Sequence, residues 1–112
     1  MNNSNFHARK WLTNNGFTET TDTAPLGSAV FTKSMTKTVE VVWHGKQDST
    51  LTVTVTLRAD NSIHVHYEKN GQTFKTKVHS YGWMKAVRAI ESTVDYAGFD
   101  LYAVDTGEEA AL

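Results

Sequence analysis

The dipeptide Asn70-Gly71 constrains the fold of this chain more than any other short stretch. Both residues tolerate positive φ angles, which the central positions of a type I′ turn require, and such a turn joins two antiparallel strands. Apolar and polar residues alternate on either side of the dipeptide, over 63–68 and 73–79. These segments predict a β-hairpin that starts with Lys69 opposite Gln72 and keeps the register set by the turn.

The predicted register divides the hairpin into an inner apolar face and an outer polar face. The pairs expected on the inner face are Tyr67 with Phe74, Val65 with Thr76 and Ile63 with Val78. The pairs expected on the outer face are His66 with Lys75 and His64 with Lys77. Imidazole and ammonium groups are therefore expected side by side on the outer face.

A third strand is predicted over 50–58, where threonine and aliphatic residues alternate strictly. Threonine suits the solvent side of a strand, because its branched Cβ packs while its hydroxyl stays hydrated. If Leu57 pairs with Ile63 across a short polar link, Thr54 and Thr56 join the rows of the two histidines. The three strands then share one continuous apolar face.

In the chain before these three strands, the sequence predicts one helix and two or three further strands. Asparagine and serine at 2–5 can cap a helix that Gly16 ends, with Phe6, Trp11 and Leu12 as its buried side chains. A short edge strand is expected around 17–21 and another strand over 29–32. A strand over 38–44 is expected to point Val39, Val41 and Trp43 inward, and 45–49 to form a hairpin loop.

After His79 the apolar spacing changes from two residues to three or four. Trp83, Val87, Ile90 and Val94 form one stripe of an amphipathic helix, which Ser80 is expected to cap and Gly98 to end. A last extended piece is expected over 99–104.

The predicted fold class is α+β. We expect an antiparallel β-meander of four or five strands, with an N-terminal and a C-terminal helix packed on one face. At 112 residues the chain has room for one core. We expect a single domain over 1–104, followed by an acidic C-terminal tail over 105–112.

Composition argues against several classes of function. The chain has no cysteine, which excludes disulfides, thiol nucleophiles and thiolate metal sites. It has no phosphate-binding glycine loop and no nucleophile-elbow motif, so we expect neither a cofactor nor an enzyme. No apolar run approaches the roughly 20 residues that span a bilayer, which favours a cytoplasmic protein without a membrane partner.

His64 and His66 are the sharpest candidates for chemistry, because side chains two apart on a strand point the same way and can reach one metal ion. His79, His44 or Glu68 would have to supply a third ligand. Each histidine is expected opposite a lysine, however, and an ammonium group disfavours a nearby dication. We therefore expect no metal, and a metal-dependent enzyme with a His-x-His site is the third hypothesis.

Charge is distributed unevenly along the chain. All 11 lysines and arginines lie at or before Arg88 with 6 acids, giving +5, whereas 6 acids and no base follow, giving −6. The acidic residues that could contact a basic partner surface are Glu91, Asp95, Asp100, Asp105, Glu108 and Glu109.

The first hypothesis is a non-enzymatic binding module that contacts a protein, such as an accessory or inhibitor protein of a phage or mobile element. The alternative is a nucleic-acid-binding domain that uses the basic outer face of the sheet. The residues of that face are Arg58, His64, His66, Lys75 and Lys77. The slightly negative total charge and the interrupting Glu40 and Glu68 count against this alternative.

Overall fold

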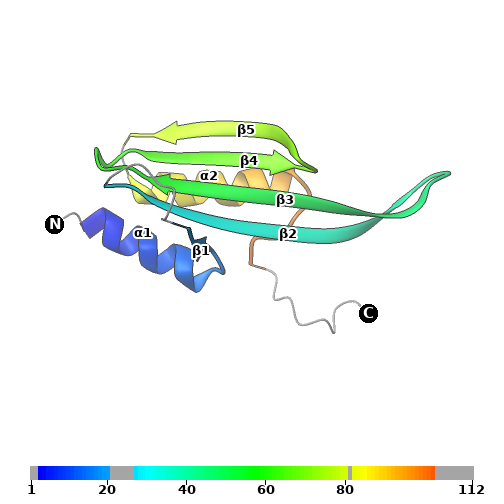
Figure 1. Ribbon diagram of the computed structural model, residues 1–112, viewed down its shortest axis with the longest axis horizontal. Helices are drawn as coiled ribbons and strands as arrows, with labels where there is room; N and C mark the ends of the chain where they lie inside the picture. Colours follow the sequence, from blue (N-terminus) through cyan, green and yellow to red (C-terminus); the bar gives the residue numbers. More distant parts are fainter. Residues whose placement is uncertain (1–2, 21–26, 81, 103–112) are drawn as a thin grey trace.

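A computed structural model describes residues 3–20, 27–80 and 82–102 (Figure 1). These residues form two helices and a five-stranded antiparallel sheet in the order β1-β2-β3-β4-β5. The elements are α1 (Asn3–Asn14), β1 (Thr18–Glu19), β2 (Ala29–Val41), β3 (Gly45–Leu57), β4 (Ile63–Lys69), β5 (Gln72–His79) and α2 (Trp83–Tyr96). The predicted α+β class and the antiparallel meander are confirmed.

Both helices and the sheet bury side chains in one hydrophobic core. From α1 come Ala8 and Leu12, and from β3 the predicted inward row over 51–57. The predicted stripe of α2 is confirmed, since Trp83, Val87, Ile90 and Val94 are all buried. Leu12 is buried as predicted and Trp11 packs partly buried against the core, whereas the side chain of Phe6 lies outside the described residues.

Lys33 of β2 ties the ends of the two helices together. Its Nζ donates to the carbonyl of Asn15 at 2.8 Å and to the carbonyl of Leu101 at 2.9 Å. Asn15 follows α1, and Leu101 lies in the segment after α2. Burial lowers the pKa of Lys33, and the nearby Asp100 carboxylate opposes that shift. A cation suits this place, because carbonyl groups at helix C-termini carry partial negative charge.

Two further lysines of the sheet hold the end of α2. Lys69 of β4 donates to the carbonyl of Ala97 at 3.2 Å. Lys37 of β2 donates to the carbonyl of Gly98, and its Nζ lies 4.8 Å from the ring centroid of Phe99. The inner side of the sheet therefore changes from apolar to cationic where it meets the C-terminal end of this helix.

The Asn70-Gly71 turn and the register next to it are as predicted. Asn70 has φ 55° and Gly71 has φ 84°, and Lys69 pairs with Gln72. On the other side of β4, Leu57 pairs with Ile63, which brings the threonine and histidine rows together as expected. The outer rows join Thr54 to His66 and Thr56 to His64.

The predicted register of β4 and β5 is wrong beyond Glu68, because a β-bulge interrupts the ladder. The observed pairs are Glu68 with Thr73, Tyr67 with Lys75, His66 with Thr76, Val65 with Lys77, His64 with Val78 and Ile63 with His79. Phe74 is the extra residue, and its ring stacks on Tyr96 of α2 with centroids 6.2 Å apart. A bulge places two residues opposite one, so every later residue of β5 faces the other side.

The predicted division of residues 29–49 is also wrong. In place of two strands and a loop over 45–49, β2 runs unbroken from Ala29 to Val41, and β3 starts at Gly45. Trp43, predicted to point inward, is almost fully exposed. Residues 32–38 are mostly threonine, lysine and serine, without the apolar alternation that would mark a strand. The sequence therefore does not indicate one continuous strand here.

The predicted ends of the helices and strands agree with the structure only in part. The edge strand expected over 17–21 is the two-residue β1. Gly82, and not Ser80, precedes α2, without a side-chain cap. Residues 99–102 form no strand, and the remainder of the predicted extended piece and the tail over 105–112 lie outside the described residues.

Candidate functional site

The hairpin of β2 and β3 extends beyond the rest of the sheet (Figure 1). The two strands pair along their whole length, from Ala29 opposite Leu57 to Val41 opposite Gly45. On the far side of β3, β4 pairs only with 51–57, and β1 pairs with β2 only near Phe31. Residues 37–49 therefore form a two-stranded ribbon, which we call the arm.

The root of the arm is fixed to the body of the sheet. Asn70 at the β4–β5 turn donates its backbone N–H to the Thr50 carbonyl at 2.8 Å, and its side-chain oxygen accepts the Thr50 N–H at 2.9 Å. Hydroxyl contacts join the two strands at the root and along the arm. Thr36 and Thr50 lie 3.0 Å apart at their Oγ1 atoms, and Thr38 donates to Asp48 at 3.0 Å. The arm is thus a paired, anchored ribbon.

The turn at the end of the arm presents large apolar side chains to solvent. Val42, Trp43 and His44 connect the strands, and the exposed fractions are 74% for Val42 and 95% for Trp43. Trp43 also has φ 74°, a left-handed conformation that is rare for bulky residues. Exposed apolar surface and backbone strain both oppose folding, and strained residues cluster where proteins bind.

Val39 and Val41 extend this apolar surface along one side of the arm. They precede the turn on β2 and are half-buried. We call Val39, Val41, Val42 and Trp43 the apolar tip. The nearest charges lie on the other side of the ribbon, where Glu40 pairs with Lys46 in the ladder. The apolar tip itself carries no charge.

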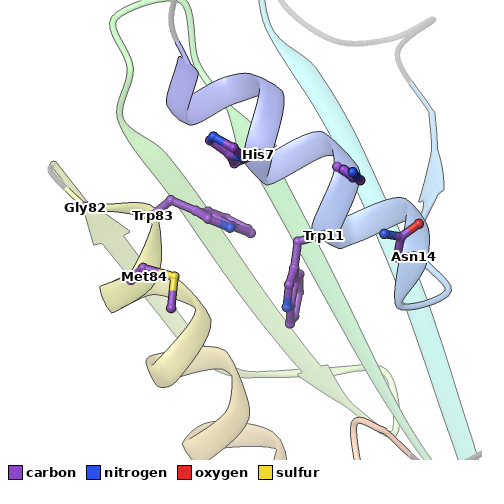
Figure 2. A pocket seen from close by; sticks show the side chains of 7 residues that line it. His7, Trp11, Asn14, Gly82, Trp83 and Met84 are labelled. Atoms are coloured by element: carbon purple, nitrogen blue, oxygen red, sulfur yellow. The ribbon is translucent and has the colours of Figure 1, made fainter.

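A groove of about 570 Å³ lies between α1 and the first turn of α2 (Figure 2). Its lining residues are His7, Lys10, Trp11, Asn14, Gly82, Trp83 and Met84. The rings of Trp11 and Trp83 meet edge to face with centroids 5.6 Å apart. Met84 is 63% exposed beside them, and none of the described residues that line the groove is acidic. We call this hollow the helix groove.

The two histidines of the predicted metal site lie on the outer face of β4. Both ring nitrogens of His66 have partners, with Nδ1 2.9 Å from Thr76 Oγ1 and Nε2 3.3 Å from a Glu68 carboxylate oxygen. His64 lies between Thr56 and Val78 in the ladder. Within residues 3–20, 27–80 and 82–102, no cluster of three histidine, cysteine or acidic residues could hold a metal ion.

The basic residues proposed for nucleic acid do not form one row with the histidines. Because of the bulge, Lys75 lies opposite Tyr67 and Lys77 opposite Val65, in the rows of core residues. Lys75 lines a hollow with Ser92, Thr93 and Tyr96 of α2. Arg58 follows β3 in the link to β4, where its backbone N–H donates to the Ser62 carbonyl at 3.0 Å.

His79 ends β5 on the same side as Lys75 and Lys77. Burial lowers its pKa from the ordinary value of 6.5, and the charges of Lys77 and Lys75 lower that pKa further. Its Nε2 is buried, and no described side chain or backbone group forms a hydrogen bond with it. The neutral imidazole is thus the favoured form in the folded protein.

Of the six acidic residues predicted to contact a partner, three lie in the described chain. Glu91 accepts a hydrogen bond from the Tyr102 hydroxyl, and burial together with Glu91 raises the pKa of Tyr102 to about 12. Asp100 accepts the Tyr102 backbone N–H at 3.0 Å, and Asp95 is exposed. Asp105, Glu108 and Glu109 lie outside the described residues. Glu91 and Asp100 therefore help to hold the segment after α2.

No known protein family matches this chain, and neither a curated protein nor a solved structure shows significant similarity to it. Among the described helices, none combines the length and the apolar character needed to cross a membrane. The class supported by the fold is a small α+β domain with a projecting β-arm.

Proposed function

We propose that the protein is a non-enzymatic binding module that contacts another protein through the apolar tip of its arm. The observation that carries the proposal is the 95% exposure of Trp43 at the end of an anchored ribbon. Tryptophan is enriched among the residues that dominate binding energy at protein interfaces. Trp43 is the anchor of the contact, and Val39, Val41 and Val42 are the other apolar residues of the tip.

The energetic gain from covering this tip is large. An aromatic side chain buries about 150–250 Å² when it is fully covered, worth roughly 4–6 kcal/mol before the costs of association. The ribbon is already ordered by its ladder and its root, so little further ordering of the backbone is needed. A preorganised anchor binds more tightly than a mobile one for this reason.

The charges of the arm favour protein over nucleic acid as the partner. Within residues 37–49, Lys37 and Lys46 are balanced by Glu40 and Asp48. Binding to a phosphate backbone draws most of its affinity from net positive charge, which this ribbon does not have. The separation of Lys75 and Lys77 from the histidine rows weakens the nucleic-acid alternative in the same way.

We extend the proposal to an inhibitor or accessory role in the cytoplasm, of the kind that phages and mobile elements encode. An arm that inserts its tip into a hollow of a target can block that hollow without catalysis. We also take both helices to cover the same face of the sheet, as their shared core supports. The threonine and histidine rows would then remain open on the opposite face.

Capture from cells that carry the gene tests the proposal. The tagged parent, Trp43→Ala and the control Tyr96→Ala are compared for the proteins that they retain. Tyr96 is also an exposed aromatic residue, but it lies on α2 and is not part of the apolar tip. We expect the parent and Tyr96→Ala to retain the same protein and Trp43→Ala to lose it. Equal retention by Trp43→Ala would rule out the tip as the contact.

A further inference from the structure

We infer that the protein that receives the apolar tip is a second copy of this chain, and that its helix groove is the receptor. The inference rests on the proposed function, because the same tip makes the contact. It adds the identity of the partner and the place where Trp43 is seated. Each copy would then offer both halves of the contact, a projecting tip and a hollow.

The tip and the helix groove match in chemistry and size. The groove has two indole rings and a half-exposed thioether, from Trp11, Trp83 and Met84. Its volume of about 570 Å³ lies within the range of about 300–1,000 Å³ that is typical of sites enclosing a compact apolar ligand. An indole that enters it meets aromatic edges and a sulfur atom, which are favourable neighbours. Neither surface would bury an acidic group.

The tip cannot reach the groove of its own chain. Ala29, at the start of β2, lies at the end of the sheet where β5 leads into α2, as the ladder from Ala29 through Leu57 and Ile63 to His79 shows. The tip lies at the other end of β2, which has 13 residues. That strand spans about 40 Å. Because β2 and β3 stay paired throughout, the arm has no hinge at which to fold back (Figure 1).

Reciprocal insertion brings the buried area closer to what a stable pair requires. One tip, with an indole and three valines, buries less than the roughly 800 Å² per partner of a standard interface. In a twofold arrangement each copy contributes a tip and a groove, which doubles the buried area and closes the assembly. The tip and the groove lie at opposite ends of the molecule, so two antiparallel copies related by a twofold axis satisfy both contacts together.

Disulfide trapping tests the seating directly, because the chain has no cysteine of its own. Val42→Cys, which keeps Trp43, is mixed with Met84→Cys under a mild oxidant. The control mixes Val42→Cys with Tyr96→Cys, whose position is on the same helix and is more exposed than that of Met84. We expect the mixed disulfide to form in the first pair well above the control. Equal yields would overturn the inference.

Sedimentation equilibrium gives the second readout. The parent is expected to dimerise, and Trp43→Ala to weaken the dimer by about 30-fold or more, the loss typical of a hot-spot anchor. Met84→Glu should weaken it as well, because a carboxylate would enter the groove. Circular dichroism checks that both variants stay folded, which their exposed positions favour. A parent that remains monomeric at all concentrations would overturn the inference.

Co-expression of tagged and untagged copies separates failure of the second-copy inference from failure of the proposed function. Tagged and untagged copies are expressed together, and the proteins retained with the tag are identified. Retention of the untagged copy by the parent, but not by Trp43→Ala, supports both. Trp43-dependent retention of a different protein alone overturns the second-copy inference and leaves the proposed function standing. Retention of nothing that depends on Trp43 overturns both.

Discussion

Tyr67 lies opposite Lys75 in the ladder between β4 and β5, and the preceding residue, Phe74, has no partner in that ladder. The bulge turns the ring of Phe74 onto Tyr96 of α2, with an angle of 26° between the ring planes. The contact links the edge strand to the last turn of the helix. The bulge also places Lys75 and Lys77 on the opposite face of the sheet from the histidine rows.

The pairing of Phe74 with Tyr96 should be measurable as a coupling energy. Stacked aromatic pairs contribute about 0.5–1.5 kcal/mol beyond the area that they bury. Urea unfolding of Phe74→Ala, Tyr96→Ala and the double variant gives this energy from a double-mutant cycle. Strict additivity of the two substitutions would show that the rings do not interact.

Gly71→Val should destabilise the protein by about 1–3 kcal/mol, because valine is strained at positive φ. Gly71 has φ 84°, and a Cβ there would meet no atom within 4 Å, so the cost arises from the backbone alone. Thermal unfolding measures the change. Thr73→Val, in the adjoining strand, is the matched control and should leave the unfolding temperature close to that of the parent. An unchanged temperature for Gly71→Val would contradict the type I′ turn.

Lys33→Met should lower the free energy of unfolding by about 1–3 kcal/mol, since two carbonyl groups would lose a charged donor. Those groups belong to Asn15 and Leu101. Lys46→Met, on the exposed arm, is the control and should have little effect. Hydrogen exchange should also quicken at the end of α1 in Lys33→Met only. Equal stability of the two variants would show that the Lys33 bridge contributes nothing.

Stability should fall as the pH drops below about 6.5, and His79 should account for part of the loss. Its pKa is below 6.5 in the folded state, so the unfolded state takes up the proton first. In the window between the two pKa values, stability therefore rises with pH. His79→Gln should flatten this part of the profile in urea titrations. By NMR, Lys77→Gln should raise the pKa of His79, and an unchanged value would show that the charge of Lys77 does not contribute to the shift.

Dialysed protein is expected to contain no stoichiometric zinc, nickel, copper or iron. The reason is that Thr76 and Glu68 already engage both ring nitrogens of His66. Elemental analysis is the measurement. A bound metal that disappears in the His64→Ala/His66→Ala variant would revive the hypothesis of a metal-dependent enzyme.

The sequence predicts the sheet well where each strand has one face on the core. The alternation over 50–58 and the Asn70-Gly71 turn correctly indicate the strands, the turn and the pairing of β3 with β4. The bulge at Phe74 could not be predicted from local pattern, because the contact that accompanies it is with Tyr96, more than 20 residues away in the chain. A turn signal sets the first pairs of a hairpin, and tertiary packing can override the rest.

The sequence does not predict the arm either, because local periodicity does not show where the core ends. Trp43 is in phase with Val39 and Val41, so periodicity places it on an inner face, although the core ends before that point is reached. The structure shows where the core ends: β4 has only 7 residues and covers little more than half of the 13-residue β3. The helix groove depends on the relative placement of two helices, about which local patterns carry no information.

Under the proposed function, the arm separates the residues that recognise a partner from the residues that form the core. None of the buried core side chains lies within 42–44, so changes there alter recognition at almost no cost in foldability. A lineage could therefore replace the tip repeatedly and acquire new targets while it keeps the same body. For the same reason, other short loops grafted between Val41 and Gly45 should yield soluble binders of altered specificity.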